Sequence, residues 1–138
     1  MVNERYRDLA PLVFRLFLAF VLIYGTLDNV LSQERMVEFR DFLAQNGFPY
    51  PPYAAYLGVY AQFIAGILFA LGLFIRYAAA VMVVNWIVAI VMVHWGLPFQ
   101  QNIAVIAMLV GAVFFVLYGA PRYSLDAWRR RGVTHGQI

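Results

Sequence analysis

Polar side chains lie within otherwise apolar stretches of this sequence, and the chemistry of four of them is the first guide to what the chain can do. The four are Tyr24, Asp28, Gln62 and His94. A phenol, a carboxylate, an amide and an imidazole set among aromatic residues can hydrogen-bond the polar head of a lipophilic molecule such as a quinone, while apolar walls hold its body. A carboxylate with a histidine can also move protons. We take these four as the candidate ligand-binding set.

The elements that must position these side chains are four apolar runs, at residues 11–31, 53–74, 77–95 and 103–119. A hydrocarbon core of roughly 30 Å asks for about 20 helical residues. Hydrophobic residues make up 64% of the chain and charged residues only 12%, which is too apolar for a soluble domain. The sequence predicts an all-α membrane protein, a bundle of four transmembrane helices forming a single domain over residues 1–138.

The distribution of arginine predicts the topology. All ten basic residues are arginine, and eight of them lie before the first run, near its start, between the second and third runs, or after the fourth. By the positive-inside rule both termini face the cytoplasm. Residues 120–138 form an interfacial tail there, in which Trp128, Arg129, Arg130 and Arg131 anchor the chain to anionic lipid. Membrane lipid, and not nucleic acid, is the expected partner of this charge, because the arginines sit at helix ends.

The first outer loop contains the only sizeable charged stretch away from the tails. Apolar residues recur at helical spacing over residues 32–45, which predicts a short amphipathic helix on the outer surface. Residues 47–52 contain three prolines and predict an extended re-entry into the second span. The loop is either a simple connector or a lid over an outward-facing pocket.

Spacing places the polar residues at different depths. Tyr24, Asp28, Gln62 and His94 all belong to the outer half of the membrane. Gln62 lies in a row with Gly58, Gly66 and Ala70, so it is expected to face the bundle interior.

Arg15, Tyr60 and Asn85 are secondary candidates. Arg15 can extend its guanidinium back to the headgroups, or hold Asp8 or a phosphate. Asn85 follows Ala78 and Met82 along one face, and in a regular helix His94 is half a turn out of phase with it.

Several kinds of chemistry are excluded by composition. The chain has no cysteine, which removes disulfides, iron–sulfur ligation and covalently attached haem. Its two histidines, His94 and His135, fall on opposite sides of the membrane in the predicted topology. We expect no metal site and no covalently bound cofactor, and the motifs leave open whether the chain is an enzyme.

The order of these elements resembles the DoxX family of membrane proteins. The resemblance is carried by Arg15–Ala19, Tyr24–Gly25, Gly47–Pro49, Ala61–Gly66, Ala70–Phe74 with Arg76, His94 and Arg122–Asp126. It implies a four-helix protein of a bacterial or archaeal cytoplasmic (inner) membrane, linked to quinone-dependent sulfur oxidation or to redox and oxidative-stress complexes. This chain departs from the family pattern, with Tyr24 where a histidine is common, Asp28 or Asn29 where a lysine is common, and Gln62 where a glutamate is common.

Three hypotheses for function follow. In the first, the chain is a quinone- or lipophile-binding accessory subunit of a membrane oxidoreductase, with a quinone as the expected ligand. In the second, it is a non-catalytic assembly protein whose small residues pack helices, alone or as a homo-oligomer; these residues are Gly58, Gly66, Ala104, Ala107 and Gly111. The third is a small transporter or a lipid-binding protein, supported only by the polar groups within the spans.

Overall fold

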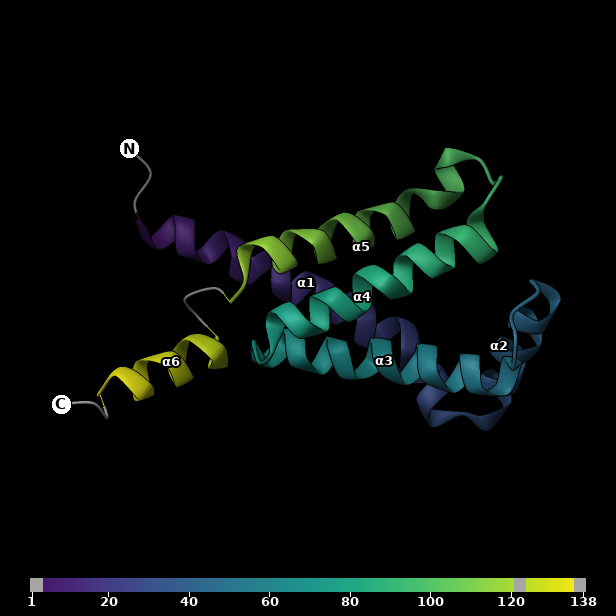
Figure 1. The fold of residues 1–138 in the computed structure, drawn as a ribbon, viewed down its shortest axis with the longest axis horizontal. Helices are drawn as coiled ribbons and strands as arrows, with labels where there is room; N and C mark the ends of the chain where they lie inside the picture. The colour runs from purple at the N-terminus through teal and green to yellow at the C-terminus, as the bar shows by residue number, and fades with distance from the viewer. Residues whose placement is uncertain (1–3, 121–123, 136–138) are drawn as a thin grey trace.

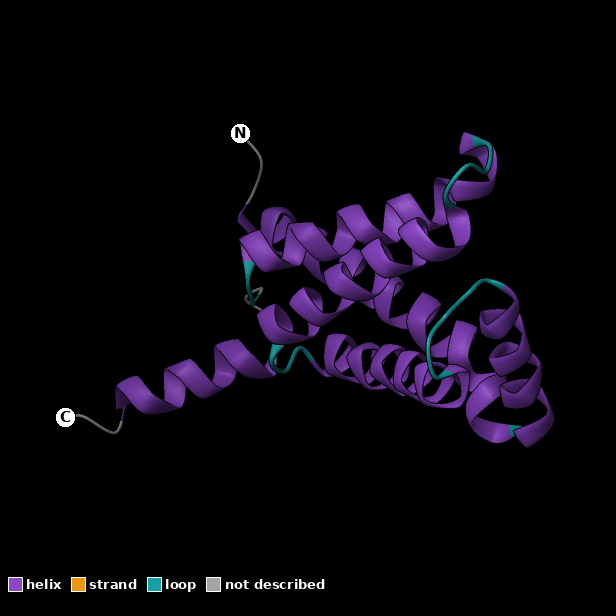
Figure 2. Cartoon of the chain, turned by 45° about the vertical axis from the view of Figure 1, so that its right-hand side comes forward, coloured by secondary structure: helices purple, strands orange, loops and turns teal. Residues whose placement is uncertain are grey.

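The structure is a computed structural model that describes residues 4–120 and 124–135, without the side chains of His94 and of residues 131–135. Over these residues it is helical and has no strand (Figures 1 and 2). The helices are α1 (Glu4–Leu31), α2 (Gln33–Gln45), α3 (Pro51–Leu71), α4 (Ile75–Ala89), the π-helical turn η1 (Ile90–His94), α5 (Phe99–Tyr118) and α6 (Leu125–His135). Four segments are long and apolar enough to cross a membrane: α1, α3, α4 continued to Val93, and α5. The predicted four-span helical fold is confirmed.

The two ends of the bundle carry different elements. The α2 helix and the connection into α5 lie at one end, whereas the N-terminus, the α3–α4 turn and α6 lie at the other (Figure 1). Both chain ends therefore leave the bundle on the same side, as four crossings require. Which side is cytoplasmic rests on the arginine distribution and stays a prediction.

The main core lies in the half of the bundle nearest α6. It joins Leu18 and Leu22 of α1 to Phe69 of α3, Met82 of α4 and Phe115 of α5, all of them buried. Phe69 and Phe115 meet edge to face with 5.6 Å between ring centroids. Small residues allow the close approach: a Cβ atom added to Gly66 would lie 2.7 Å from Ile23 Cγ1. The expected packing role of Gly66 is confirmed.

Two other glycines that were expected to pack helices, Gly111 and Gly58, differ in whether a neighbouring helix contacts them. A Cβ atom on Gly111 would lie 3.0 Å from both Leu18 Cδ atoms, so this glycine also lets two helices meet. At Gly58 nothing lies within 4 Å of such an atom, so the expectation that it packs a neighbouring helix is wrong for this chain on its own. The row of small residues on α3 is therefore used at only one of its two glycines.

A second, smaller core attaches α2 to α3. Met36 and Leu43 of α2 are buried against Ala55 and Val59 of α3. The N-terminus of α2 is capped by Ser32, whose hydroxyl accepts a hydrogen bond from the backbone N–H of Arg35 at 3.4 Å. The predicted amphipathic helix is confirmed, with its apolar face against the bundle.

The re-entry into the second span is shorter than expected. Pro51 and Pro52 form the first turn of α3 and are not part of an extended segment. Proline suits a first helical turn, because the N–H that it lacks would have no partner within the helix and its φ is already helical. The chain reverses at Tyr50, which has a positive φ of 49°.

Candidate functional site

The predicted residues of α1 face away from its packed side. The buried residues of α1 form a stripe that includes Leu18, Leu22 and Thr26. Tyr24 and Asp28 each follow a member of this stripe by two residues, about 200° around a helix of 3.6 residues per turn. Tyr24 is 72% exposed and stacks on Phe20, and Asp28 is exposed. Both side chains lie on the outside of this bundle.

Gln62, by contrast, continues the packed side of α3. It is half-buried and lies one turn from Val59 and one turn from Gly66, both of which are buried. Because Gly66 packs against Leu22 and Ile23 of α1, Gln62 lies on a core-facing stripe. Within one chain, Gln62 is therefore separated from Tyr24 and Asp28, although all three remain untested as ligand contacts.

Asn85 continues the packed side of α4 in the same way. The buried residues of α4 are Ile75, Ala78, Ala79 and Met82, and Asn85 follows one turn later, half-buried. The expectation that Asn85 shares a face with Ala78 and Met82 is confirmed, and that face is the one that packs.

Gln62 and Asn85 lie at similar distances along their helices from the α3–α4 turn. The chain turns between Leu71 and Ile75; Gln62 is nine residues before this turn and Asn85 ten residues after it. At 1.5 Å per residue these are rises of about 14 and 15 Å. On each of the antiparallel helices α3 and α4, the packed face therefore carries an amide side chain at this distance from the turn. We call this position the polar level.

On α4 and the facing part of α5 the buried residues end near this level, whereas α3 continues into the second core at Val59 and Ala55. Between Val83 and Ala107 none of the described side chains is buried. The α4–α5 pair also diverges from α3 toward the end of the bundle that carries α2 (Figures 1 and 2). Next to Asn85, the indole Nε1 of Trp86 is buried and has no hydrogen-bond partner among the described residues. A buried N–H in that state is uncommon.

Two further candidates have other surroundings. Tyr60 is 41% exposed and stacks on Tyr56, whose hydroxyl accepts a hydrogen bond from Gln33 Nε2 at 3.1 Å. This stack links α3 to α2. His94 ends the π-helical turn η1, and its side chain is outside the described part. The half-turn offset between Asn85 and His94 assumed a regular α-helix, and the wider π turn changes that register.

The guanidinium of Arg15 extends to the α6 end of the bundle, but the expectation that it reaches the headgroups as an exposed group is wrong, because protein encloses it. The Arg15 side chain is 3% exposed. A Cβ atom added to Gly72 would lie 2.6 Å from Arg15 Nη1 and 2.5 Å from Ser124 Cβ, so the guanidinium sits between the α3–α4 turn and the start of α6. Packing of α6 over this end of the bundle encloses it.

Asp126 holds this junction together, a role that the sequence did not reveal. Its two carboxylate oxygens accept hydrogen bonds from the backbone N–H groups of Phe74 and Ile75, at 2.9 and 3.0 Å. Its own N–H donates to Gly72 O at 3.0 Å. Asp126 thus caps the N-terminus of α4 from another helix. Asp126 lies in the first turn of α6, and nothing in its spacing pointed to a partner about 50 residues away.

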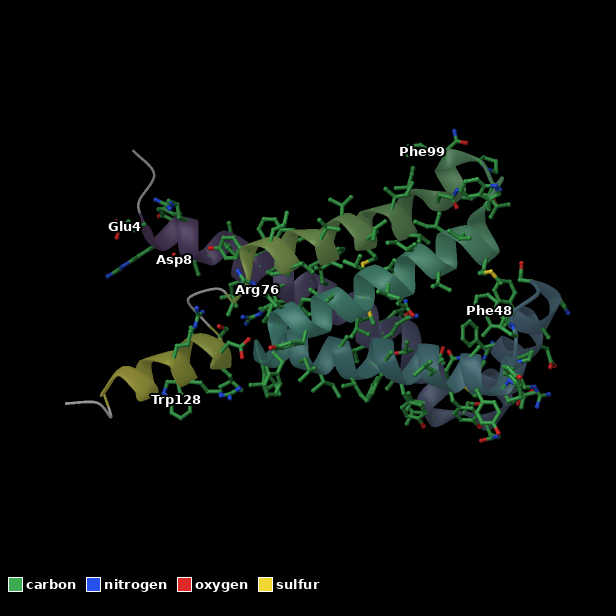
Figure 3. The ribbon with its side chains drawn as sticks, in the orientation of Figure 1. Glu4, Asp8, Phe48, Arg76, Phe99 and Trp128 are labelled. Carbon is green, nitrogen blue, oxygen red and sulfur yellow. The ribbon has the colours of Figure 1, made fainter. Side chains whose placement is uncertain are left out.

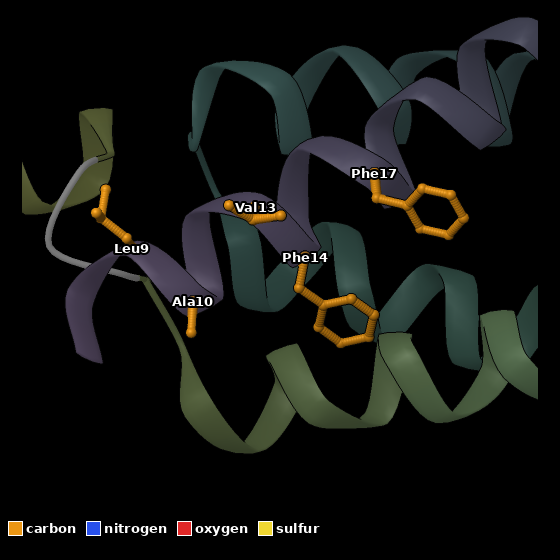
Figure 4. Close-up of a pocket in the computed structure, with 5 residues that line it drawn as sticks. All are labelled: Leu9, Ala10, Val13, Phe14 and Phe17. Atoms are coloured by element: carbon orange, nitrogen blue, oxygen red, sulfur yellow. The ribbon is translucent and has the colours of Figure 1, made fainter. Parts of the chain in front are cut away.

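An apolar hollow lies along α1 near the same end, beside the contact of Phe14 with Phe114 and Phe115 of α5. It has a volume of about 650 Å³ and is lined by Leu9, Ala10, Val13, Phe14 and Phe17 (Figure 4). All five residues come from one helix, so the hollow is a lipid-facing surface more than an enclosed site.

The predicted lipid anchor is partly described. Trp128 is 70% exposed on α6, and Arg129 and Arg130 are exposed as well. The side chain of Arg131 lies outside the described part, as do Arg122 and Tyr123 from the family resemblance. Among the described residues no three His, Cys, Asp or Glu side chains come together as metal ligands. Lipid anchoring and the absence of a metal both stay predictions.

Comparison with known proteins gives one match. No curated protein and no solved structure was found to match the chain. The model of the DoxX family matches residues 10–95, which is more than half of the chain and covers α1 to η1. This multi-pass helical membrane protein therefore belongs to the DoxX family.

Proposed function

We propose that the protein is an accessory subunit of a redox complex in a bacterial or archaeal cytoplasmic membrane, and that it binds a quinone or a similar lipophile for a partner oxidoreductase. The observation that carries the proposal is the polar level at Gln62 and Asn85, beyond which α4 has no buried residue among those described. The Trp86 N–H lies beside it without a partner in the described residues.

The chemistry of these groups suits the head of a quinone. Amide and indole N–H groups can donate to a quinone carbonyl, and the apolar surfaces of α4 and α5 can hold its isoprenoid tail. Neither an amide nor an indole can take up or release a proton at neutral pH, so these residues bind and orient. Electrons and protons are supplied by the partner. The chain has no cysteine, so it carries no thiol, iron–sulfur or covalently attached haem centre.

The test is quinone binding by the purified full chain in neutral detergent, followed by quenching of tryptophan fluorescence. The variants are Gln62→Leu and Asn85→Leu, with Gln101→Leu as matched control, an exposed amide at the start of α5. A lost hydrogen bond of about 1 kcal/mol weakens binding roughly fivefold in each variant and leaves the control unchanged. If a variant that combines Gln62→Leu and Asn85→Leu binds quinone as tightly as the control does, the proposed quinone site is refuted.

A second function, assembly of a membrane complex, is favoured by the outer face of α1. Phe17, Phe20 and Tyr24 are 59–72% exposed along one side, and Asp28 ends the row. A carboxylate on an exposed aromatic face suits contact with another subunit or a second copy. This role predicts that Tyr24→Ala and Asp28→Ala release partner chains in native mass spectrometry but leave quinone affinity unchanged.

A further inference from the structure

A basic pocket lies at the α6 end of the bundle and is separate from the polar level at Gln62 and Asn85. It has a volume of about 980 Å³ and opens between the start of α4, the end of α5 and the first turns of α6. Three arginines line it: Arg76, Arg129 and Arg130. Figure 3 shows Arg76 at this end, and Trp128 pointing away from the bundle on α6.

The described lining of the pocket is positive in sign. It contains three arginines and one carboxylate, Asp126, both of whose oxygens accept hydrogen bonds from the backbone of α4. A guanidinium presents parallel N–H donors that match two oxygens of a phosphate, so the pocket suits a phosphate group.

Each of the three arginines is exposed and contacts a neighbouring group. Arg129 lies over the ring of Phe74 at 5.0 Å, and Arg130 Nη2 is 3.5 Å from Ala120 O. A Cβ atom on Gly119 would lie 3.0 Å from Arg76 Nε, so this guanidinium fills the space above a glycine. The same Asp126 contacts fix the first turn of α6 and with it the position of the pocket wall.

The position of the pocket favours a lipid headgroup as the source of the phosphate group. One candidate span begins beside the pocket, at Ile75, and another ends beside it, at Tyr118. The pocket therefore lies at the level of the lipid headgroups. Its lining also includes the rings of Phe74, Tyr77 and Tyr118, which are 44–75% exposed. Aromatic rings beside arginines can contact the glycerol and upper acyl chain while the arginines hold the phosphate.

We propose that this pocket is a specific site for an anionic phospholipid, whose headgroup phosphate binds Arg76, Arg129 and Arg130. The site differs from general attraction of the basic tail to a membrane, because Arg76 comes from the other side of the pocket, on α4. A bound lipid links α4 to α6.

The test is a lipid titration of the full chain in neutral detergent, read by native mass spectrometry. Phosphatidylglycerol, phosphatidylcholine and inorganic phosphate are compared. The pocket variant is Arg76→Gln with Arg130→Gln. The control is Arg5→Gln with Arg7→Gln, which removes the same charge at the same end of the bundle.

We expect phosphatidylglycerol to bind at least tenfold more tightly than phosphatidylcholine. The pocket variant should lose roughly tenfold or more in affinity for phosphatidylglycerol, while the control changes by less than about twofold. Equal losses in the two variants, or equal binding of the two lipids, would overturn the proposal. Inorganic phosphate that binds as tightly as the lipid would also overturn it, and would identify free phosphate as the ligand.

A second variant protects the test against loss of folding. Arg76→Lys keeps the charge but loses the paired donors of the guanidinium. It is expected to weaken phosphatidylglycerol binding several-fold at an unchanged unfolding temperature. If both Arg76→Lys and the pocket variant bind phosphatidylglycerol with wild-type affinity, the pocket does not recognise phosphate.

Discussion

Replacing Asp126 by alanine tests the junction that joins α6 to the rest of the bundle. The change removes both acceptors of the N–H groups of Phe74 and Ile75, which lie 2.9 and 3.0 Å from the carboxylate oxygens. These two donors belong to the start of α4, where the helix itself offers no acceptor. We expect the variant to lose stability and to release α6 from the α3–α4 turn.

The magnitude follows from the two hydrogen bonds. A hydrogen bond to a charged group contributes about 1.5–3 kcal/mol, but the one to Phe74 is exposed and water can replace it. Loss of an N-cap costs about 0.5–2 kcal/mol. The combined loss for Asp126→Ala is therefore about 2–3 kcal/mol. Asp126→Asn keeps one acceptor oxygen, so its loss is about half as large.

The assay is unfolding of the purified protein in mixed micelles, with hydrogen exchange followed at the N–H groups of Phe74, Ile75 and α6. Asp41→Ala is the matched control, because Asp41 pairs with Arg40 on the surface of α2 at 3.2 Å. An exposed pair of this kind contributes less than about 1 kcal/mol. If Asp126→Ala and Asp41→Ala lose the same stability, and exchange at Phe74 and Ile75 does not change, the capping role of Asp126 is refuted.

Three other changes test the packing of the bundle. Gly66→Ala places a methyl group 2.7 Å from Ile23 Cγ1, so it should lower the unfolding temperature, and a second change of Ile23 to alanine should restore part of the loss. Phe115→Ala removes a fully buried ring; since lipid is as apolar as the core, packing alone is lost, about 1–3 kcal/mol in denaturant titrations, whereas Phe114→Ala at 38% exposure should cost clearly less. Gly72→Ala combines a positive φ of 71° with a contact of 2.5 Å to Ser124 Cβ, so a loss of at least about 1–2 kcal/mol is expected; wild-type stability in this variant would contradict the packed turn.

Tertiary packing decided several features that spacing left open. A charged residue near the end of a span can extend to the headgroups or be enclosed by protein, and only the position of α6 shows that Arg15 is enclosed. The partner of Asp126 is likewise set by how α6 returns to the α3–α4 turn. Separation of Tyr24 and Asp28 from Gln62 depends on which face of α1 meets α3, and depth along a helix does not define that face.

The sequence by itself determined the membrane class, the four spans, the amphipathic α2, and the packed face of α3 that carries Gly66. These follow from hydrophobic length and helical periodicity, which are local properties of the chain. The arrangement of helices around the bundle decided the rest: the burial of Arg15, the partner of Asp126 and the basic pocket against α6. Each of these brings together residues from helices far apart in the chain, and local spacing carries no information about how such helices meet.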